Sequence, residues 1–79
     1  MSDPWLGQIE VFAFDYPPKD WVQCAGQLLL ISQNQALFSI IGTSFGGDGI
    51  RTFALPDLRG VAPDHMTYSI CTAGVWPAS

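Results

Sequence analysis

Few side chains in this sequence could act as a general base, a nucleophile or a metal ligand. His65 is the only histidine, and it lies between Asp64 and Met66 in a proline-containing segment typical of a loop. A hydrolytic triad needs a base beside a nucleophile, and a lone exposed histidine is most often a solvated side chain. Glu10 is the only glutamate, and the aspartates stand mostly in turn-forming stretches, so paired catalytic carboxylates are not indicated. We therefore expect no enzymatic activity.

Metal ions and cofactors lack a binding pattern as well. No Cys-x-x-Cys or His-x-x-x-His spacing is present. The glycine-rich stretch 46–49 lacks the Gly-Lys-Ser/Thr of a phosphate-binding loop, so we expect no nucleotide, no other cofactor and no metal. These residues fit a tight turn in which the Asp48 carboxylate accepts hydrogen bonds from neighbouring amides.

The two cysteines, Cys24 and Cys71, leave two states open. Thiols in a chain made in a reducing cytosol are usually buried and reduced. After release into an oxidising environment, Cys24 and Cys71 could form a disulfide with each other or between chains. The distance between their Cα atoms would decide between these states.

The composition points to contacts with other chains. The 79 residues are 48% hydrophobic and 13% charged, whereas charged residues make up about a quarter of an average globular domain. A chain this small has a large surface for its volume, so its many apolar side chains predict that other copies cover part of that surface. The residues that we expect at subunit contacts are Trp5, Phe12, Phe14, Val75 and Trp76.

Charge and hydropathy exclude two classes of partner. The net charge is −4 and only three residues are basic, so the chain has no patch that would neutralise the phosphates of a nucleic acid. No apolar run approaches the roughly 20 residues of a membrane span. The N-terminal MSDPW has an acidic residue and a proline where a signal peptide has basic residues. We expect synthesis in the cytoplasm without a signal peptide.

Short strands must position these residues. The stretches that predict strands are 6–14, 21–24, 27–30, 52–55 and 67–71. In the first strand, Ile9, Val11 and Ala13 share an apolar face that we expect to be buried. The second and third strands flank Gly26, whose freedom to adopt positive φ predicts a hairpin between them.

One helix is predicted at about 32–42. Ser32 and Gln35 have the spacing of a capping box, and Gly42 stands where a helix commonly ends. So short a helix is unstable alone, so packing of its apolar face must hold it. Beyond the following strand, Asp57 is placed to pair with Arg59 or Arg51, a structural ion pair and not a catalytic one.

Four blocks of sequence together resemble a known family. They are WVQCAGQ at 21–27, SQNQALF at 32–38, IGTSFGGDG at 41–49 and FALPDLRG at 53–60. Over roughly Leu6 to Gly60, this combination is similar to the bacteriophage tail collar domain, which small bacterial proteins of the microcystin-dependent-protein-like type also carry. The sequence departs from the family at Asp20, where a glycine is usual. Residues 61–79 also differ from the longer glycine-rich continuation that usually follows this motif and leads into a receptor-binding region, so we expect an isolated building block without a receptor-binding tip.

The resemblance implies an α+β fold, a small domain of short β-strands with one short helix. We expect a single domain over 1–79, with a motif block at 6–60 and an extended C-terminal tail at 61–79. The implied function is that of a non-enzymatic, self-assembling structural subunit of a phage-tail-like particle or extracellular filament, where the protein would act. Its partners would be copies of itself, in a trimer or a helical filament, and other tail or filament proteins.

An alternative function stays open. Exposed aromatic side chains such as Tyr68 and Trp76 could stack on sugar rings, although packing is the commoner role of such residues. The chain would then be a small surface-binding module of a tail fibre, directed at a carbohydrate or a receptor.

Overall fold

The structure, a computed structural model, describes residues 4–13 and 17–76. Within these ranges the predicted α+β class, with short strands and one short helix, is confirmed. The elements in chain order are β1 (Ile9–Phe12), β2 (Trp21–Gln23), β3 (Leu28–Leu30), a 3-10 turn (Ile31–Gln33), α1 (Gln35–Ile41), β4 (Thr52–Ala54) and β5 (Thr67–Cys71). No helix in the described part of the chain is long and apolar enough to cross a bilayer.

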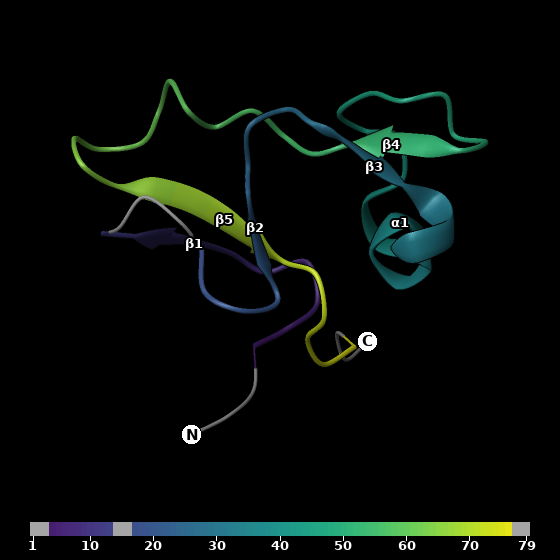
Figure 1. Cartoon of the computed structure of the whole chain (residues 1–79), viewed down its shortest axis with the longest axis horizontal. Coiled ribbons are helices and arrows are strands. Elements are labelled where there is room, and N and C mark those ends of the chain that lie inside the picture. Colours follow the sequence, from purple (N-terminus) through teal and green to yellow (C-terminus); the bar gives the residue numbers. More distant parts are fainter. Residues whose placement is uncertain (1–3, 14–16, 77–79) are drawn as a thin grey trace.

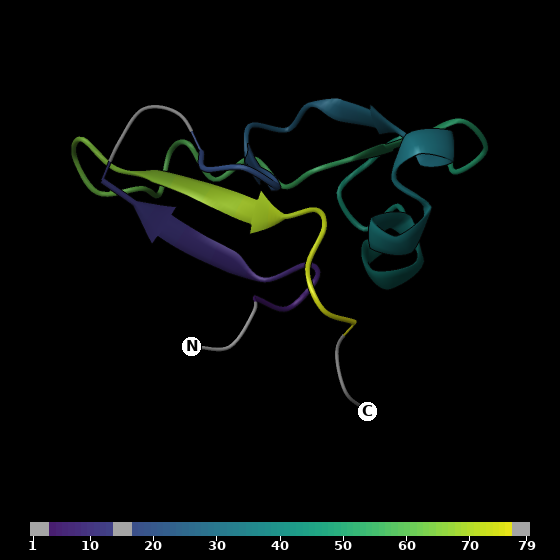
Figure 2. The ribbon, with the colours of Figure 1, turned by 60° about the horizontal axis from the view of Figure 1, so that its bottom comes forward.

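β5 forms the centre of a three-stranded sheet of order β1-β5-β2 (Figures 1 and 2). Both neighbours run antiparallel to it, with Ile9 opposite Ile70 in one pair and Trp21 opposite Cys71 in the other. The strand predicted at 67–71 is confirmed as β5, and this strand from the segment that we expected to be an extended tail is the centre of the sheet.

β3 and β4 form a separate two-stranded antiparallel sheet, with Leu29 opposite Phe53. The predicted hairpin between 21–24 and 27–30 is wrong, because β2 and β3 belong to different sheets. Gly26, at φ 77°, turns the chain between them, and its amide donates to the Pro56 carbonyl at 3.3 Å. This bond and the bridge between Ala25 and Asp57 hold the segment that connects β2 in the first sheet to β3 in the second.

α1 is shorter than predicted and begins differently. Residues Ile31–Gln33 form a separate 3-10 turn, and the residue before α1 is Asn34, so the capping box at Ser32 is wrong. The Asn34 side chain does not cap α1; its Nδ2 donates to the Leu30 carbonyl at 3.0 Å. The predicted end is confirmed, because Gly42 follows α1 with φ 57° and its amide donates to the Phe38 carbonyl at 2.7 Å.

The core draws on both sheets and on α1. Its buried hydrophobic side chains are Leu6, Cys24, Leu37, Phe53, Leu55 and Ile70. Leu37 anchors α1 in this core, and the Phe38 ring lies 5.3 Å from the Phe53 ring. Burying a side chain of this size contributes roughly 1.5–3 kcal/mol, so packing holds a helix that has no side-chain cap.

The face of β1 that we expected to be buried is open to solvent, so that expectation is wrong. Ile9, Val11 and Ala13 are all exposed. The cause is the position of β1 at the edge of its sheet. The core packs under the central strand, where Ile70, directly opposite Ile9, is buried.

Candidate functional site

The two ends of the described chain pair with each other. The Leu6 amide donates to the Val75 carbonyl at 2.7 Å, and the Val75 amide donates to the Pro4 carbonyl at 2.8 Å. These bonds form a parallel bridge between Trp5 and Val75. Residues paired in this way have neighbouring side chains, and Trp76 follows directly. Trp5, Val75 and Trp76, which we call the terminal cluster, are 48%, 45% and 58% exposed.

Gly74 makes this close pairing of the ends feasible. A Cβ atom at Gly74 would meet the Pro4 carbonyl oxygen, would lie 2.7 Å from the Cys71 sulfur and would lie 2.8 Å from the Leu6 nitrogen. Any side chain at this position would push the two segments apart. Gly74 was not among the predicted site residues, and its one signal in the sequence is a glycine between a predicted strand and the aromatic end of the chain.

The other two predicted contact residues are not in the terminal cluster. Phe12 is half-buried and meets the Trp21 ring edge-on, with the ring centroids 5.2 Å apart. Because these rings belong to the two outer strands, they meet across β5, which agrees with the complete burial of Ser69 between them in the register. A contact of Phe12 with another copy stays a prediction. Phe14 lies outside the described residues.

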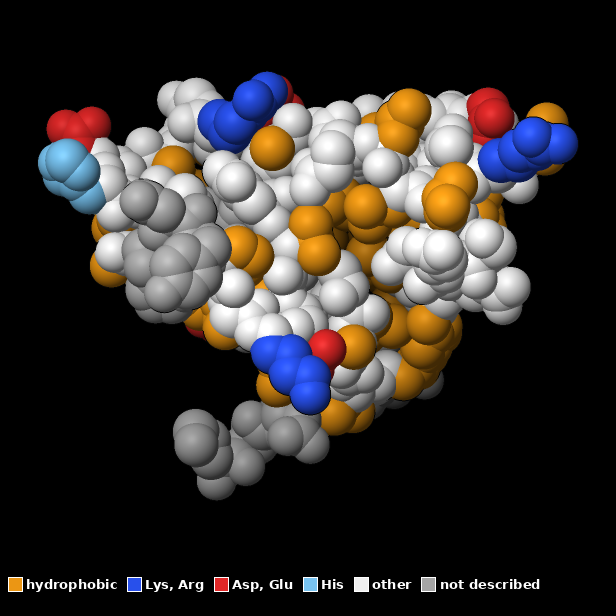
Figure 3. Space-filling model, in the orientation of Figure 1, with side chains coloured by type: hydrophobic (Ala, Val, Ile, Leu, Met, Phe, Trp, Pro, Cys, Tyr) orange, Lys and Arg blue, Asp and Glu red, His pale blue; other side chains and the backbone are white. Residues whose placement is uncertain are grey.

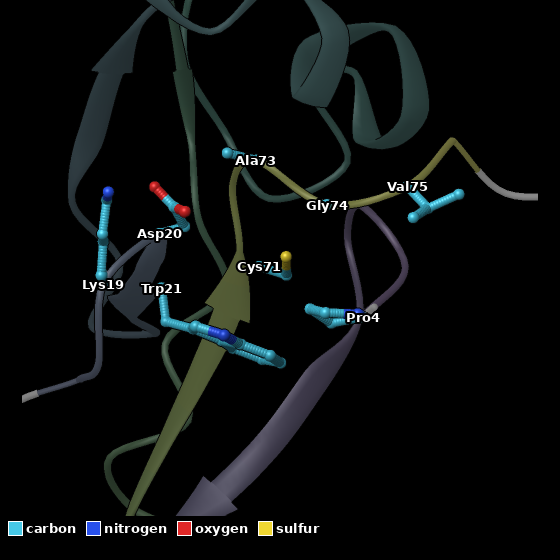
Figure 4. A pocket seen from close by; sticks show the side chains of 8 residues that line it. All are labelled: Pro4, Lys19, Asp20, Trp21, Cys71, Ala73, Gly74 and Val75. Atoms are coloured by element: carbon cyan, nitrogen blue, oxygen red, sulfur yellow. The ribbon is translucent and has the colours of Figure 1, made fainter. Parts of the chain in front are cut away.

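A pocket of about 430 Å³ opens beside the paired ends (Figure 4). Its lining residues are Pro4, Lys19, Asp20, Trp21, Cys71, Ala73, Gly74 and Val75. The Trp21 indole, the Asp20 carboxylate and the Lys19 side chain belong to one continuous segment, opposite Gly74 and Pro4. Asp20 has φ 68°, and its carbonyl accepts hydrogen bonds from the amide and the hydroxyl of Thr72, at 2.8 and 3.1 Å. The pocket thus combines an aromatic ring with both signs of charge.

The residues that could perform acid–base or metal chemistry are dispersed. His65 is exposed in the loop between β4 and β5, with φ 64°. Across 4–13 and 17–76, no three His, Cys, Asp or Glu side chains are grouped so as to hold a metal ion. Cys24 and Cys71 are both buried and free, so no disulfide joins them in this structure. Burial raises the pKa of Cys24 to about 11, which makes its thiol a poor nucleophile at neutral pH.

Asp48 fixes the glycine-rich turn, as the sequence predicts. Its Oδ1 accepts hydrogen bonds from the backbone amides of Ile50, Arg51 and Thr52, at 2.8, 2.8 and 3.0 Å. These bonds favour the ionised form, those from Thr52 and Arg51 most, and lower the pKa of Asp48 to about 2. The carboxylate therefore serves to shape the backbone.

The turn also packs directly on β4. Gly47 has φ 93°, and a Cβ atom there would meet the Phe53 Cα and would lie 2.7 Å from the Thr52 carbonyl oxygen. The Gly46 carbonyl accepts a hydrogen bond from the Ala54 amide, and the Gly49 amide donates to the Thr52 carbonyl. The glycines are thus required by a close approach of two backbone segments.

Asp57 pairs with Arg59, one of the two partners that the sequence left open. The Arg59 guanidinium donates two hydrogen bonds to the carboxylate, from Nε at 2.9 Å and from an Nη at 2.8 Å, and the Arg59 amide donates a third. The guanidinium hydrogen bonds lower the pKa of Asp57 to about 2. The pair is exposed and lies in a turn, so its role is structural.

A comparison of the sequence with known protein families matches the part of the chain in which Asp48 and Asp57 shape the backbone. The family described as the phage tail collar domain matches residues 7–63. A search of curated proteins gave no match. The matched range contains both aspartate-centred turns and α1, whereas β5 and two members of the terminal cluster follow it. Because the match covers more than half of the sequence, the chain belongs to the phage tail collar domain family.

Proposed function

We propose that this protein is a self-assembling structural subunit of a phage tail or a phage-tail-like filament, with no catalytic role. Its family indicates a structural role in a phage tail. The observation that carries the proposal of self-assembly is the terminal cluster. Three large apolar side chains lie at paired or adjacent positions of the two chain ends, and about half of each is exposed.

Covering the terminal cluster would supply a driving force for association. Tryptophans at the centre of an interface often contribute 2 kcal/mol or more each, on the order of a thirtyfold change in affinity. The pairing of the ends fixes the backbone at Trp5 and Val75 in advance, so less conformational entropy is lost when a partner binds. The partners would be further copies of the chain, in a closed trimer or an open filament, and other proteins of the virion tail or filament.

Light scattering during size-exclusion chromatography tests this proposal. We expect the wild-type mass to rise with protein concentration, and the double variant Trp5→Ala/Trp76→Ala to need at least about tenfold more protein for the same mass. Val61→Ala is the matched control, because Val61 is an exposed apolar residue in a loop away from the cluster. A wild type that stays monomeric at every concentration, or equal association of wild type and double variant, would refute the proposal.

The pocket beside the terminal cluster favours a second candidate, carbohydrate binding. Indole rings stack on sugar rings, and carboxylates accept hydrogen bonds from sugar hydroxyls. Trp21 and Asp20 line the same pocket. Tyr68, which the sequence offered for this role, packs against the core, whereas Trp76 is exposed near the pocket residue Val75.

A glycan array probed with the wild type and with Asp20→Asn distinguishes this candidate. Asparagine tolerates the positive φ of position 20, so thermal stability should be preserved. Binding of a glycan by the wild type that is lost in Asp20→Asn would support a carbohydrate site. If the wild type binds no glycan on the array, the candidate is discarded.

A further inference from the structure

The backbone of β3 has one hydrogen-bonding edge that no described residue covers. The Leu55 amide donates to the Gln27 carbonyl, and the Ile31 amide donates to the Arg51 carbonyl. In an antiparallel pair the bonded positions alternate, so residues 27, 29 and 31 direct their backbone groups toward β4. The amide and carbonyl of Leu28, and the amide of residue 30, therefore point away from β4.

The outer edges of the other strands are covered by hydrogen bonds within the chain or contain a charged residue. The glycine-rich turn covers the far edge of β4, through the bonds of Gly46 and Gly49 described above. At β2, the Trp21 amide donates to the Pro18 carbonyl, and the Gln27 side chain donates to the Gln23 carbonyl. β1 is the other outer strand of its sheet, and Glu10 lies in the middle of it. A charge in an edge strand is a common protection against pairing with another chain.

The open edge of β3 has no such protection. No charged residue occurs between Asp20 and Asp48 in the sequence. Leu28 and Leu30 are 60% and 47% exposed, and Ile50, which borders the same groove as Leu30, is 82% exposed. Figure 3 shows hydrophobic side chains gathered over β3 and α1 on this face. An apolar, uncharged, unpaired strand edge favours addition of another strand.

We propose that β3 pairs antiparallel with β3 of a second copy, about a two-fold axis at Leu28. The two sheets then form one four-stranded sheet of order β4-β3-β3-β4. The amide and carbonyl of Leu28 bond reciprocally to the same groups of the copy, so both free groups are satisfied. A register centred on Leu30 is disfavoured, because its carbonyl already accepts a hydrogen bond from Asn34.

The charges that flank β3 agree with a second copy as its partner. Arg51 lies at the end of the sheet near Leu30, and Asp57 lies at the opposite end, next to Ala25. Antiparallel pairing places Arg51 of one copy at the same end as Asp57 of the other. Asp57 is already paired with Arg59 of its own chain, so neither end of the joint sheet brings unpaired like charges together across the seam.

Cysteine cross-linking reports this register. Hydrogen-bonded antiparallel partners have Cα atoms about 5.5 Å apart, within the range of a disulfide. Leu28→Cys should therefore cross-link to its own copy under mild oxidation with oxidised glutathione. Leu30→Cys is the matched control on the same strand and face. In the proposed register its two copies are offset by four residues, about 13 Å, which is beyond disulfide reach.

The expected result is a covalent dimer as the main oxidised species of Leu28→Cys and little or none with Leu30→Cys. The native cysteines are buried and should not compete. No cross-link at position 28, or equal cross-linking at both positions, would overturn the proposal. A measurement on the wild type keeps the test valid if a variant fails to fold. The Leu28 amide should exchange with deuterium more slowly as protein concentration rises, and a rate independent of concentration would also overturn the proposal.

This seam is separate from the terminal cluster, so the two proposals fail independently. Cross-linking of Leu28→Cys should persist when Trp5→Ala/Trp76→Ala is added to the same chain. If both contacts form, each copy joins others at two places, which allows assembly to extend beyond a dimer.

Discussion

The turn region, residues 31–60, and the three-stranded sheet are held by contacts of very different range. In the turn region, Asp48 binds amides two to four residues away, and Asp57 binds Arg59 two residues away. In the sheet, Ile9 pairs with Ile70, and Trp21 pairs with Cys71. The shape of the turn region is therefore fixed by hydrogen bonds between residues close in the sequence, whereas the sheet forms only when distant segments pair.

The residues that fix the backbone are also different from the residues proposed to contact other copies. The distinctive residues of the turn region are the two aspartates and the glycines at 42, 46, 47 and 49, and they are occupied by hydrogen bonds or close backbone contacts within the chain. The exposed tryptophans Trp5 and Trp76 lie at the ends that the sheet brings together. The collar motif thus builds a scaffold. The terminal cluster proposed for self-assembly lies outside the matched range, whereas the edge of β3 lies within it.

The largest effect is expected from Gly47→Ala in the turn region. The new Cβ would meet the β4 backbone, and φ 93° is strained for alanine. We expect a loss of about 4 kcal/mol or more, comparable with the whole stability of a small domain, measured by urea unfolding. Gly60→Ala is the control, because a Cβ there meets nothing within 4 Å. Similar unfolding midpoints for the two variants would show that the turn does not pack on β4 as described.

Gly74→Ala is the corresponding change in the sheet half, and we expect a smaller loss of roughly 2 kcal/mol. The added Cβ would disrupt the pairing of the chain ends but leave the turn region intact. Amide exchange separates these effects: exchange of the Val75 amide should accelerate, while that of the Thr52 amide should not. Equal acceleration at both sites would mean that the two regions do not behave as distinct units.

A third prediction concerns pH and the turn region alone. The pKa of Asp48 is lowered from 3.8 to about 2 in the folded chain, so its ionised form stabilises the fold above pH 4. This contribution is lost as the pH falls from about 4 toward 2. Asp48→Asn should lower the melting temperature at pH 7 and reduce the loss of stability between pH 4 and pH 2. An unchanged pH profile in Asp48→Asn would contradict the described hydrogen bonds.

The smallest effect is expected in the sheet, from Ser69→Ala. The Ser69 hydroxyl is buried, and its oxygen has no hydrogen-bond partner within the described residues. Removing an unsatisfied buried hydroxyl should stabilise the fold by about 1 kcal/mol. Thermal unfolding measures this change, and a clear loss of stability would show that the hydroxyl is bonded in solution.

The sequence predicted the local features of the fold well. The roles of Gly42 and Asp48, and the pairing of Asp57 with one of two candidate arginines, follow from contacts between residues close in the sequence. The capping box at Ser32 failed because residues 31–33 form their own turn and Asn34 precedes α1. Whether the helix begins after Ser32 or after Asn34 depends on how these residues pack, and a capping pattern in the sequence gives no information on packing.

The long-range pairings could not be predicted in the same way. β2 has a nearby candidate partner in β3, but it pairs with β5, which is much later in the sequence. For the terminal cluster, the composition predicted contacts with other copies, and Trp5, Val75 and Trp76 were among the residues expected there. That Trp5 and Val75 meet depends on Gly74, whose importance appears only once the segments are placed in space.

Electron microscopy of the purified wild-type chain at increasing protein concentration tests the central claim of self-assembly most directly. The account predicts particles or filaments much larger than one 79-residue chain, which become rarer in Trp5→Ala/Trp76→Ala at the same concentration. Fields that contain only monomer-sized particles at every concentration would contradict it.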